Sequence, residues 1–259
     1  FKNPACVIIK HAIPCGVSET KNIVSAWKNA YSADELSAFG GVVSLNKKVD
    51  IKLAKLLLKV FLEVIIAPNF TKDALQLLKK KSNLRVLKIK SIKDYAKSSD
   101  RQLTMLGNSF MVQERDKFIL KKSQIKAVSK KVPNERQCSD LIFANKVVKY
   151  VRSNAIVIAK NKTTVGIGSG NTSRVDSVNF AIKKSSRIKL NNNNNKILNG
   201  SVMASDAFFP FEDSIKLANK YGIIAIIQPG GSINDKKVID EINKSKMVMV
   251  FTNKRSFSH

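Results

Sequence analysis

The sequence predicts an α/β protein, and three observations support that prediction. Short runs of β-branched residues alternate with stretches in which apolar residues recur at helical spacing, and this alternation continues through both halves of the chain. A length of 259 residues with 44% hydrophobic residues is enough to bury a core, which excludes global disorder. No apolar run reaches the roughly 18 residues that span a bilayer, and the opening residues contain no secretory signal, so we expect no membrane partner.

The first half of the chain begins with a predicted buried strand, and helical spacing is clearest where Leu53, Leu56, Leu57 and Val60 recur. The predicted strands are Ala5–Ile9, Glu63–Pro68 (which its proline ends), Leu84–Ile89 and a further short run, Phe110–Gln113. The predicted helices are Ser18–Ala30, Ile51–Phe61 and Lys72–Lys80.

The segment Asp116–Val132 is rich in lysine and shows little periodicity, so we interpret it as a linker or surface connection. We therefore expect two domains, 1–130 and 131–259. In the second, the predicted helices are Ser139–Tyr150, Ser173–Lys184, Asp213–Lys220 and Asp235–Asn243. The predicted strands are Ala155–Ala159, Thr163–Ile167, Ser201–Ser205, Ile223–Ile227 and Met247–Phe251. The run Asn191–Asn195 is predicted to be a solvated, low-complexity loop.

The net charge of +27 favours nucleic-acid binding at first sight, but the residue types argue against specific recognition. Only eight of the 46 basic residues are Arg, the residue best suited to bidentate contacts with phosphates and bases. Lys and Asn are both encoded by A/T-rich codons, so a biased genome accounts for both excesses. We expect weak, salt-sensitive binding to polyanions and no specific nucleic-acid partner.

The three cysteines, Cys6, Cys15 and Cys138, form no CxxC pair and no even disulfide framework. This pattern is typical of free thiols in a reducing cytoplasm. The segment from His11 to Cys15 shares residue types with the zinc deaminases. It lacks the glutamate two residues after the histidine and the second cysteine of that motif, so we predict no zinc.

Lys10 and His11 stand at the carboxyl end of the first predicted strand, where ligands gather in α/β sheets. A neutral imidazole accepts a proton near neutral pH, and the adjacent ammonium supplies positive charge, so the pair is a candidate for acid–base chemistry. An ordinary surface pair at a strand end is the alternative, and the dipeptide alone favours it.

Two glycine-rich turns each follow a predicted strand and precede a helix. The turn from Gly166 to Arg174 offers backbone N–H groups and a guanidinium for an anion, although its G-x-G-x-G spacing is not a dinucleotide-binding fingerprint. The turn Pro229–Ser232 repeats the arrangement. Ordinary tight turns remain the alternative for each.

The loop Ser205–Asp213 holds three phenylalanines within four residues, and such a loop can form a stacking platform for a planar ligand. Burial of these rings against the core is the alternative. Ser37–Gly41 is a similar turn of small residues.

Taken together, these segments resemble the formyltransferase domain of the bifunctional purine biosynthesis proteins, which join AICAR transformylase to IMP cyclohydrolase. The matching stretches run in family order along essentially the whole chain: Pro4–Gly16, Ser37–Gly41, Phe61–Pro68, Asn83–Leu87, Asp140–Ala155, Thr164–Ser177, Ala204–Asp213, Ile227–Ser232 and Phe251–His259. Chance does not explain agreement at this density, so the resemblance outweighs the ordinary interpretations of single motifs.

The resemblance implies transfer of a formyl group from 10-formyltetrahydrofolate, as co-substrate, to the 5-amino group of AICAR. His11 would take the proton from that amine, and Lys10 would stabilise developing charge and help protonate folate N10. Asn154 would orient the carboxamide and formyl groups, and His259 matches a terminal histidine near the family site.

The resemblance also implies the substrate-binding residues. Arg174 would contact the nucleotide, and Arg255 its phosphate or a neighbouring carboxylate. Phe208 would pack on a planar ring, and Asp213 would bind the pterin. Ser232 would belong to a turn that donates N–H groups, and Gly41 to the small-residue turn.

The implied fold is a pair of cytidine-deaminase-like α/β/α subdomains without zinc, in a cytoplasmic homodimer with its site at the interface. A monovalent cation such as potassium near Ser153 is left open. The chain begins later than the family domain does, so the resemblance implies that the cyclohydrolase domain and the start of the transformylase domain are missing here.

The chain departs from the family pattern at Ile13, where Asn is usual, at Asp34-Glu35, where Asp-Pro is usual, and at Gly107-Asn108, where Gly-Gly is usual. These departures and the late start keep an alternative open, namely a truncated, catalytically impaired remnant that serves only as a structural or association domain.

Overall fold

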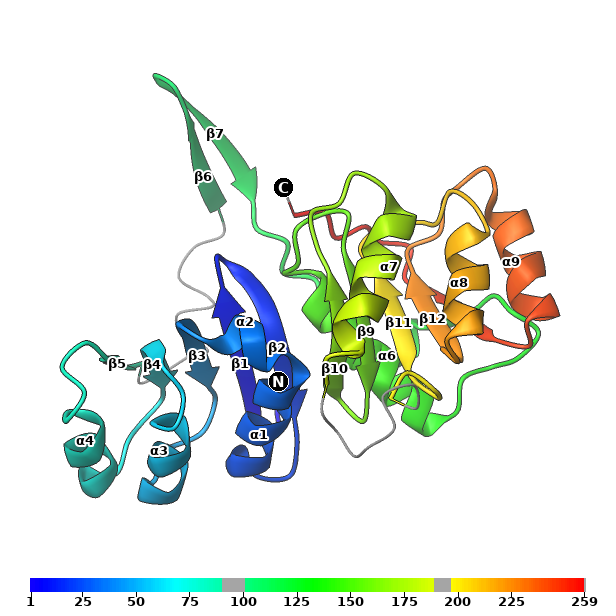
Figure 1. Ribbon diagram of the computed structural model, residues 1–259. Coiled ribbons are helices and arrows are strands. Elements are labelled where there is room, and N and C mark those ends of the chain that lie inside the picture. Colours follow the sequence, from blue (N-terminus) through cyan, green and yellow to red (C-terminus); the bar gives the residue numbers. More distant parts are fainter. Residues whose placement is uncertain (90–100, 189–196, 259) are drawn as a thin grey trace.

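A mixed β-sheet runs through both halves of the protein in the computed structural model, which describes residues 1–89, 101–188 and 197–258 (Figure 1). Within these ranges the sheet has eleven strands in the order β5-β4-β3-β1-β2-β10-β9-β11-β12-β13-β8. The strands pair in parallel at β3-β4-β5 and at β11-β12-β13, and antiparallel in between. The predicted α/β class is therefore confirmed.

The elements of the first half alternate between strands and helices after an opening hairpin. In chain order they are β1 (Ala5–Lys10), β2 (Ile13–Glu19), α1 (Ile23–Ala33), α2 (Glu35–Ala38), β3 (Gly41–Leu45), α3 (Ile51–Leu57), β4 (Leu62–Ala67), α4 (Lys72–Leu78) and β5 (Arg85–Lys88). A separate hairpin of β6 (Arg101–Leu106) and β7 (Ser109–Glu114) projects from the body (Figure 1).

The second half follows a short 3₁₀ helix at Lys122–Gln124. Its elements are β8 (Lys126–Ala127), α6 (Glu135–Val148), β9 (Ile156–Lys160), β10 (Thr163–Gly168), α7 (Arg174–Ser185), β11 (Val202–Ser205), α8 (Asp213–Lys220), β12 (Ala225–Gln228), α9 (Asp235–Lys244) and β13 (Val248–Phe251). No helix within the described residues is both long and apolar enough to cross a membrane.

Helix starts follow directly from the sequence. The side chains of Asn22, Asp50 and Ser173 each accept a backbone N–H three residues further along, at the starts of α1, α3 and α7. These bonds satisfy N–H groups that have no partner within the helix.

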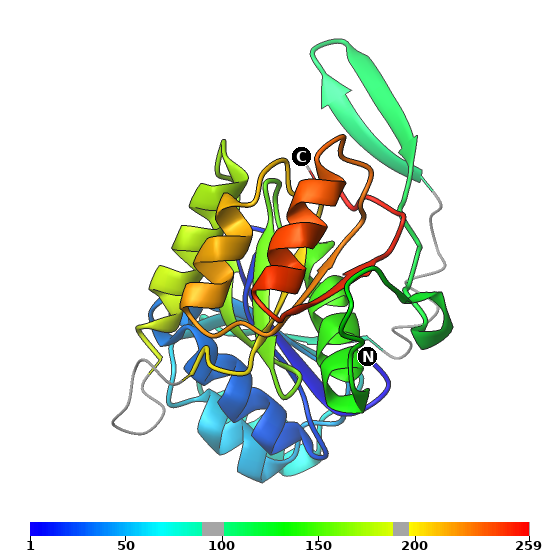
Figure 2. The same ribbon diagram turned by 90° about the vertical axis from the view of Figure 1, so that its right-hand side faces the viewer.

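The two halves bury their sheet differently. In the first half, α1, α3 and α4 form one core with a single sheet face, around Trp27, Leu45 and Ile65. In the second half the strands alternate, so that Val157 packs with α6 while Ile158 packs with α7, α8 and α9 on the other face. Figure 2 shows these three helices on one side of the sheet and α6 on the other.

The halves meet at a short junction between β2 and β10. Ser18 lies opposite Thr163, their hydroxyl oxygens are 2.7 Å apart, and the Val17 N–H donates to the Thr164 hydroxyl at 3.0 Å. A second link lies at the helix layer, where Lys184 of α7 forms an ion pair with Asp34 between α1 and α2.

The predicted helix Ser18–Ala30 is wrong at its start, because the segment after the β1 turn is a strand. Pro14 lies opposite a register shift in β1, where its missing N–H is tolerated. Gly16 faces α1 so closely that a Cβ would lie 2.0 Å from the Ala30 carbonyl oxygen. Both residues therefore serve the strand and its packing.

The predicted linker also contains structure. Leu120 is buried in the second core, and β8 pairs with β13 at the far edge of the sheet. Residues from 120 onward thus contact the second half, ahead of the predicted boundary near 130. The two expected domains remain a prediction, and Asn191–Asn195 lie outside the described residues.

We expect Gly16→Ala to destabilise the protein, because the new Cβ would collide with the α1 backbone. Forced overpacking costs about 1–3 kcal/mol, which lowers Tm by several degrees in a chain of this size. Gly107→Ala is the control, since a Cβ there meets nothing within 4 Å and only the positive φ of 58° opposes it. Equal Tm values for the two variants, measured by thermal denaturation, would contradict the packing argument.

The Lys184–Asp34 pair predicts a pH dependence of stability. Burial acts to raise the pKa of Asp34, but hydrogen bonds from Lys184 and Ser37 outweigh it and hold the pKa below its ordinary value. A lowered pKa adds stability above the unfolded pKa of about 3.9, and that stability is lost as the pH falls through the folded value. Asp34→Asn should therefore lower the free energy of unfolding by about 1–3 kcal/mol near neutral pH.

The difference between Asp34→Asn and the native chain should close as the pH falls below about 4. Chemical denaturation at a series of pH values measures it. A difference that does not change with pH would show that the carboxylate charge is not what stabilises this junction.

Candidate functional site

The candidate residues lie along one edge of the sheet. β1 ends at Lys10, and β2 and β3 begin beside it because both pair antiparallel with β1. The antiparallel pairing then continues through β10 and β9 to β11, so β11, β12 and β13 end at the same edge. The sheet topology thus gathers the strand ends that carry the predicted site.

Lys10 is fastened to the turn that precedes β3. Its ammonium donates to the carbonyl oxygens of Phe39 at 2.7 Å and Gly40 at 3.1 Å. A Cβ on Gly40, whose φ is +65°, would lie 2.7 Å from the Lys10 nitrogen. Gly40 is therefore the glycine that admits the ammonium. Gly41, the glycine predicted to form the small-residue turn, instead starts β3.

His11 occupies the tip of the β1–β2 hairpin. His11 and Ala12 both have positive φ values, 51° and 62°, as a tight two-residue hairpin turn requires. His11 is an exposed residue. The hairpin thus presents His11 at the sheet edge, directly after Lys10 in the chain.

Arg174 and Asn154 are joined in the second half by a buried network. The guanidinium donates to the Asn154 side-chain oxygen and to the Ser205 hydroxyl, both at 2.8 Å. It also forms an ion pair with Asp206, and neither charged side chain is more than 7% exposed. Arg174 therefore holds Asn154 in place, and its predicted contact with a nucleotide remains a prediction.

Asp206 is the centre of this network, although no sequence motif indicated it. Its carboxylate accepts from Arg174, from the Ala155 N–H at 3.1 Å and from the Ser153 hydroxyl, and its backbone oxygen accepts from Ser256. The available signal was its position, because a carboxylate directly after a buried strand lies at the ligand-binding edge of a sheet.

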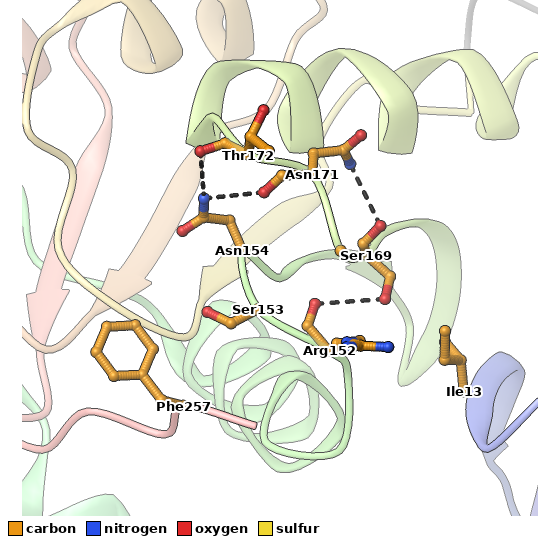
Figure 3. A pocket seen from close by; sticks show the side chains of 9 residues that line it. Ile13, Arg152, Ser153, Asn154, Ser169, Asn171, Thr172 and Phe257 are labelled. Carbon is orange, nitrogen blue, oxygen red and sulfur yellow. Dashed lines mark hydrogen bonds between the residues drawn. The ribbon is translucent and has the colours of Figure 1, made fainter. Parts of the chain in front are cut away.

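A pocket opens beside Asn154, where the β1–β2 turn meets the second half (Figure 3). Its volume is about 710 Å³. The lining residues are Ile13, Arg152, Ser153, Asn154, Ser169, Gly170, Asn171, Thr172 and Phe257. The Asn154 amide donates to the backbone oxygens of Asn171 and Thr172, at 3.0 and 3.1 Å. Ile13, the first residue of β2 after the turn at His11 and Ala12, contributes to this wall, whereas Lys10 and His11 are not among the lining residues.

The first glycine-rich turn has a packing role. Gly166 and Gly168 lie in β10, and a Cβ on either would come within 2.2 Å of a backbone oxygen of α7. The Gly170 N–H donates to the Arg152 oxygen at 2.9 Å. Gly166 and Gly168 therefore have a structural role, because they let α7 approach β10 closely.

The phenylalanine loop is divided between core and surface. Phe209 is fully buried, Phe211 is exposed, and the Arg255 guanidinium lies 4.8 Å from the centre of the Phe208 ring. Three adjacent stacking rings are therefore not formed. The loop presents Phe208 under a cation, which places two predicted substrate residues in contact.

Asp213 and Ser232 lie on the segments that follow two neighbouring strands, β11 and β12. Asp213 begins α8, and its carboxylate accepts from the next backbone N–H. The loop of Ser232 is tied to the phenylalanine loop because Asn234 donates to the Pro210 oxygen at 2.9 Å. The Gly231 N–H already donates to the Asp235 carboxylate, so this turn is not an empty anion cradle.

The structure thus assembles the predicted residues in groups. Lys10 is near the Gly41 turn, Arg174 contacts Asn154, and Arg255 contacts Phe208. Within the described ranges, no hydrogen bond or ion pair joins His11 to another candidate, and His259 lies outside those ranges.

The cysteines are free and buried. Burial raises the pKa of the Cys15 thiol to about 11. The residues that the structure describes contain no group of three or more His, Cys, Asp or Glu side chains arranged to hold a metal ion.

We expect Asp206→Asn to be strongly destabilising, because it leaves the buried Arg174 guanidinium without its counter-charge. Removing one partner of a buried ion pair costs about 3–5 kcal/mol. Glu135→Gln is the control, since it breaks only a solvent-exposed pair with Lys122, and exposed pairs contribute little to stability. Denaturant titration measures both, and similar losses in the two variants would refute the central role of Asp206.

Comparison with known proteins identifies the family. The family model described as AICARFT/IMPCHase bienzyme matches residues 1–184. The chain is 49% identical to the bifunctional purine biosynthesis protein PurH of Persephonella marina and 48% identical to that of Caldicellulosiruptor saccharolyticus. It is 46% identical to the PurH of Wigglesworthia glossinidia brevipalpis.

Each of these alignments covers 100% of this chain and 47–48% of the relative, so the chain spans about half the length of the curated relatives it matches. The resemblance seen in the sequence motifs is confirmed across the whole chain. The chain belongs to the AICARFT/IMPCHase bienzyme family.

Proposed function

We propose that this chain transfers the formyl group of 10-formyltetrahydrofolate to the 5-amino group of AICAR, giving FAICAR and tetrahydrofolate in purine biosynthesis. The observation that carries the proposal is the β1–β2 hairpin, whose exposed tip holds His11 directly after Lys10, a residue whose ammonium two carbonyl oxygens fix. Membership of the family supports the same reaction.

In the proposed reaction the amine nitrogen attacks the formyl carbon, and His11 accepts a proton from that nitrogen. The bond between the formyl carbon and folate N10 then breaks, and N10 gains a proton. Lys10 directs two of its three N–H groups to backbone oxygens of the described chain, so the third is available to the developing negative charge or to N10.

The remaining candidates receive proposed binding roles. Asn154, held by Arg174, orients the carboxamide and formyl groups. Phe208 packs on a planar ring, and Arg255 pairs with a phosphate or carboxylate. Asp213 binds the pterin, and the turn of Ser232 supplies N–H donors. Gly41 contributes through the small-residue turn, and His259 contributes from the chain end.

We further propose two cytidine-deaminase-like subdomains, 1–130 and 131–259, within a homodimer that completes the site. Exposed apolar side chains on the β6–β7 hairpin, among them Leu103, Met105 and Phe110, support an interface, because such patches mark contact surfaces. A monovalent cation such as potassium near Ser153, the absence of zinc and a cytoplasmic location stay predictions.

A structural or association role without turnover is the second candidate. The chain spans about half of its relatives, and Ile13 places an apolar side chain on the wall of the pocket where the family pattern has an amide. Formyl-transfer assays separate the two candidates.

We expect His11→Ala to lower kcat by about 10²–10⁴-fold, the usual contribution of a general base. Formation of tetrahydrofolate, followed by absorbance with AICAR present and absent, measures it. Lys72→Ala, on an exposed lysine of α4, is the control and should retain the native rate. Absence of AICAR-dependent turnover in the native chain, or a native rate in His11→Ala, would overturn the proposal.

A further inference from the structure

The ion pair between Lys184 and Asp34 connects the last turn of α7 to the first half of the protein. The nitrogen of Lys184 lies 2.6 Å from Asp34 Oδ2, and the two side chains are 18% and 4% exposed. Because the pair is largely shielded from water, it fixes the distance between its two elements more firmly than a surface pair does.

Asp34 also determines where α2 begins. Its second carboxylate oxygen accepts the Ser37 N–H at 3.1 Å, its backbone oxygen accepts the Ala38 N–H at 3.0 Å, and Lys184 reaches the Ser37 hydroxyl at 3.3 Å. A helix of four residues is a single turn and is not stable by itself. The orientation of α2 therefore depends on Asp34 and on the lysine that holds it.

The turn that fastens Lys10 follows α2 directly. The residue after α2 is Phe39, whose carbonyl oxygen accepts from Lys10, and the carbonyl of Gly40 does the same. The Gly40 N–H in turn donates to the Phe61 oxygen at 2.8 Å. A displacement of α2 would move the two oxygens that hold the ammonium.

The same charged groups also act on one buried thiol, that of Cys15. Burial is the main reason that its pKa is raised to about 11, but Asp34 raises it further while Lys184 and Lys10 lower it. All three charged groups therefore act on the same buried sulfur.

The other end of α7 carries Arg174, which holds Asn154. Arg174 and Lys184 are ten residues apart, or about 15 Å along a helix. The first turn of α7 therefore carries Arg174, which holds Asn154. Its last turn carries Lys184, which holds Asp34 and through it the turn that binds Lys10.

We propose that Lys184 and Asp34 are positioning residues for Lys10. We further propose that α7 sets the spacing between the turn at Phe39 and Gly40, which holds the Lys10 ammonium, and the network around Asn154. The inference rests on the proposed function for its catalytic consequence. A merely structural role would affect stability alone and would act independently of Lys10.

The test compares Asp34→Asn and Lys184→Met with Lys184→Arg, which keeps the charge. We expect the first two to lower kcat by about ten- to hundredfold, the scale of a misplacement near 1 Å, with KM changed less than about twofold. Lys184→Arg should restore most of the rate. Lys122→Met, which breaks an exposed pair, should keep the native kcat.

A double-mutant cycle separates positioning from general destabilisation. If Asp34 acts through Lys10, Asp34→Asn causes no further loss of kcat in a Lys10→Met background. A loss of equal size in both backgrounds, at a temperature where all variants are folded, would overturn the proposal.

Amide hydrogen exchange tests the positioning without any assay of activity. The Gly40 N–H and the N–H groups of α2 should exchange faster in Asp34→Asn and Lys184→Met, and at the native rate in Lys122→Met. If the native chain shows no formyl transfer, the proposed function fails while this measurement still decides the positioning. Unchanged exchange at Gly40 would refute the positioning itself.

Discussion

The buried ion pair between Arg174 and Asp206 is the constraint on which the organisation of the candidate site depends. A charge inside a protein costs several kcal/mol unless a counter-charge and hydrogen bonds satisfy it. Asp206 therefore has to collect the Arg174 guanidinium, the Ser153 hydroxyl and the Ala155 N–H at one point. The start of α7, the loop before β9 and the end of β11 converge there, and the carboxyl-terminal segment joins them through Ser256.

The same convergence explains why residues distant in the sequence share one edge of the sheet. Asn154 is not free to turn, because the guanidinium that balances Asp206 also donates to its side-chain oxygen. In the first half the corresponding fixed group is Lys10, which two carbonyl oxygens hold. The proposed chemistry thus uses side chains whose orientations are already set before a substrate binds, which is the condition for electrostatic stabilisation at low reorganisation cost.

Local patterns in the sequence were sufficient to predict most of the elements. Helix α3, for example, has clear periodicity and the cap residue Asp50, and these signals are local. The strand β2 was missed because Pro14 and Gly16 are signals of a turn when only neighbours in the sequence are considered. Their actual partners are a register shift in β1 and the backbone of α1, which the sequence alone does not bring together.

The candidate site shows the same division between local and long-range information. Motifs indicated Lys10, His11 and Asn154, because a family pattern preserves residue types in order. They did not indicate that Asp206 is the centre of a network, or that Gly40 is the glycine against the ammonium. Both facts depend on contacts between segments 30 or more residues apart.

The contacts at the two ends of α7, made by Arg174 and Lys184, depend on the number of residues between them. Each residue added to an α-helix turns everything after it by about 100° and advances it by about 1.5 Å. A single insertion between Arg174 and Lys184 would leave both side chains present but rotate the ammonium away from Asp34. The rotational phase of this helix is therefore under constraint. A comparison of relatives should find substitutions along α7 far more often than insertions or deletions within it.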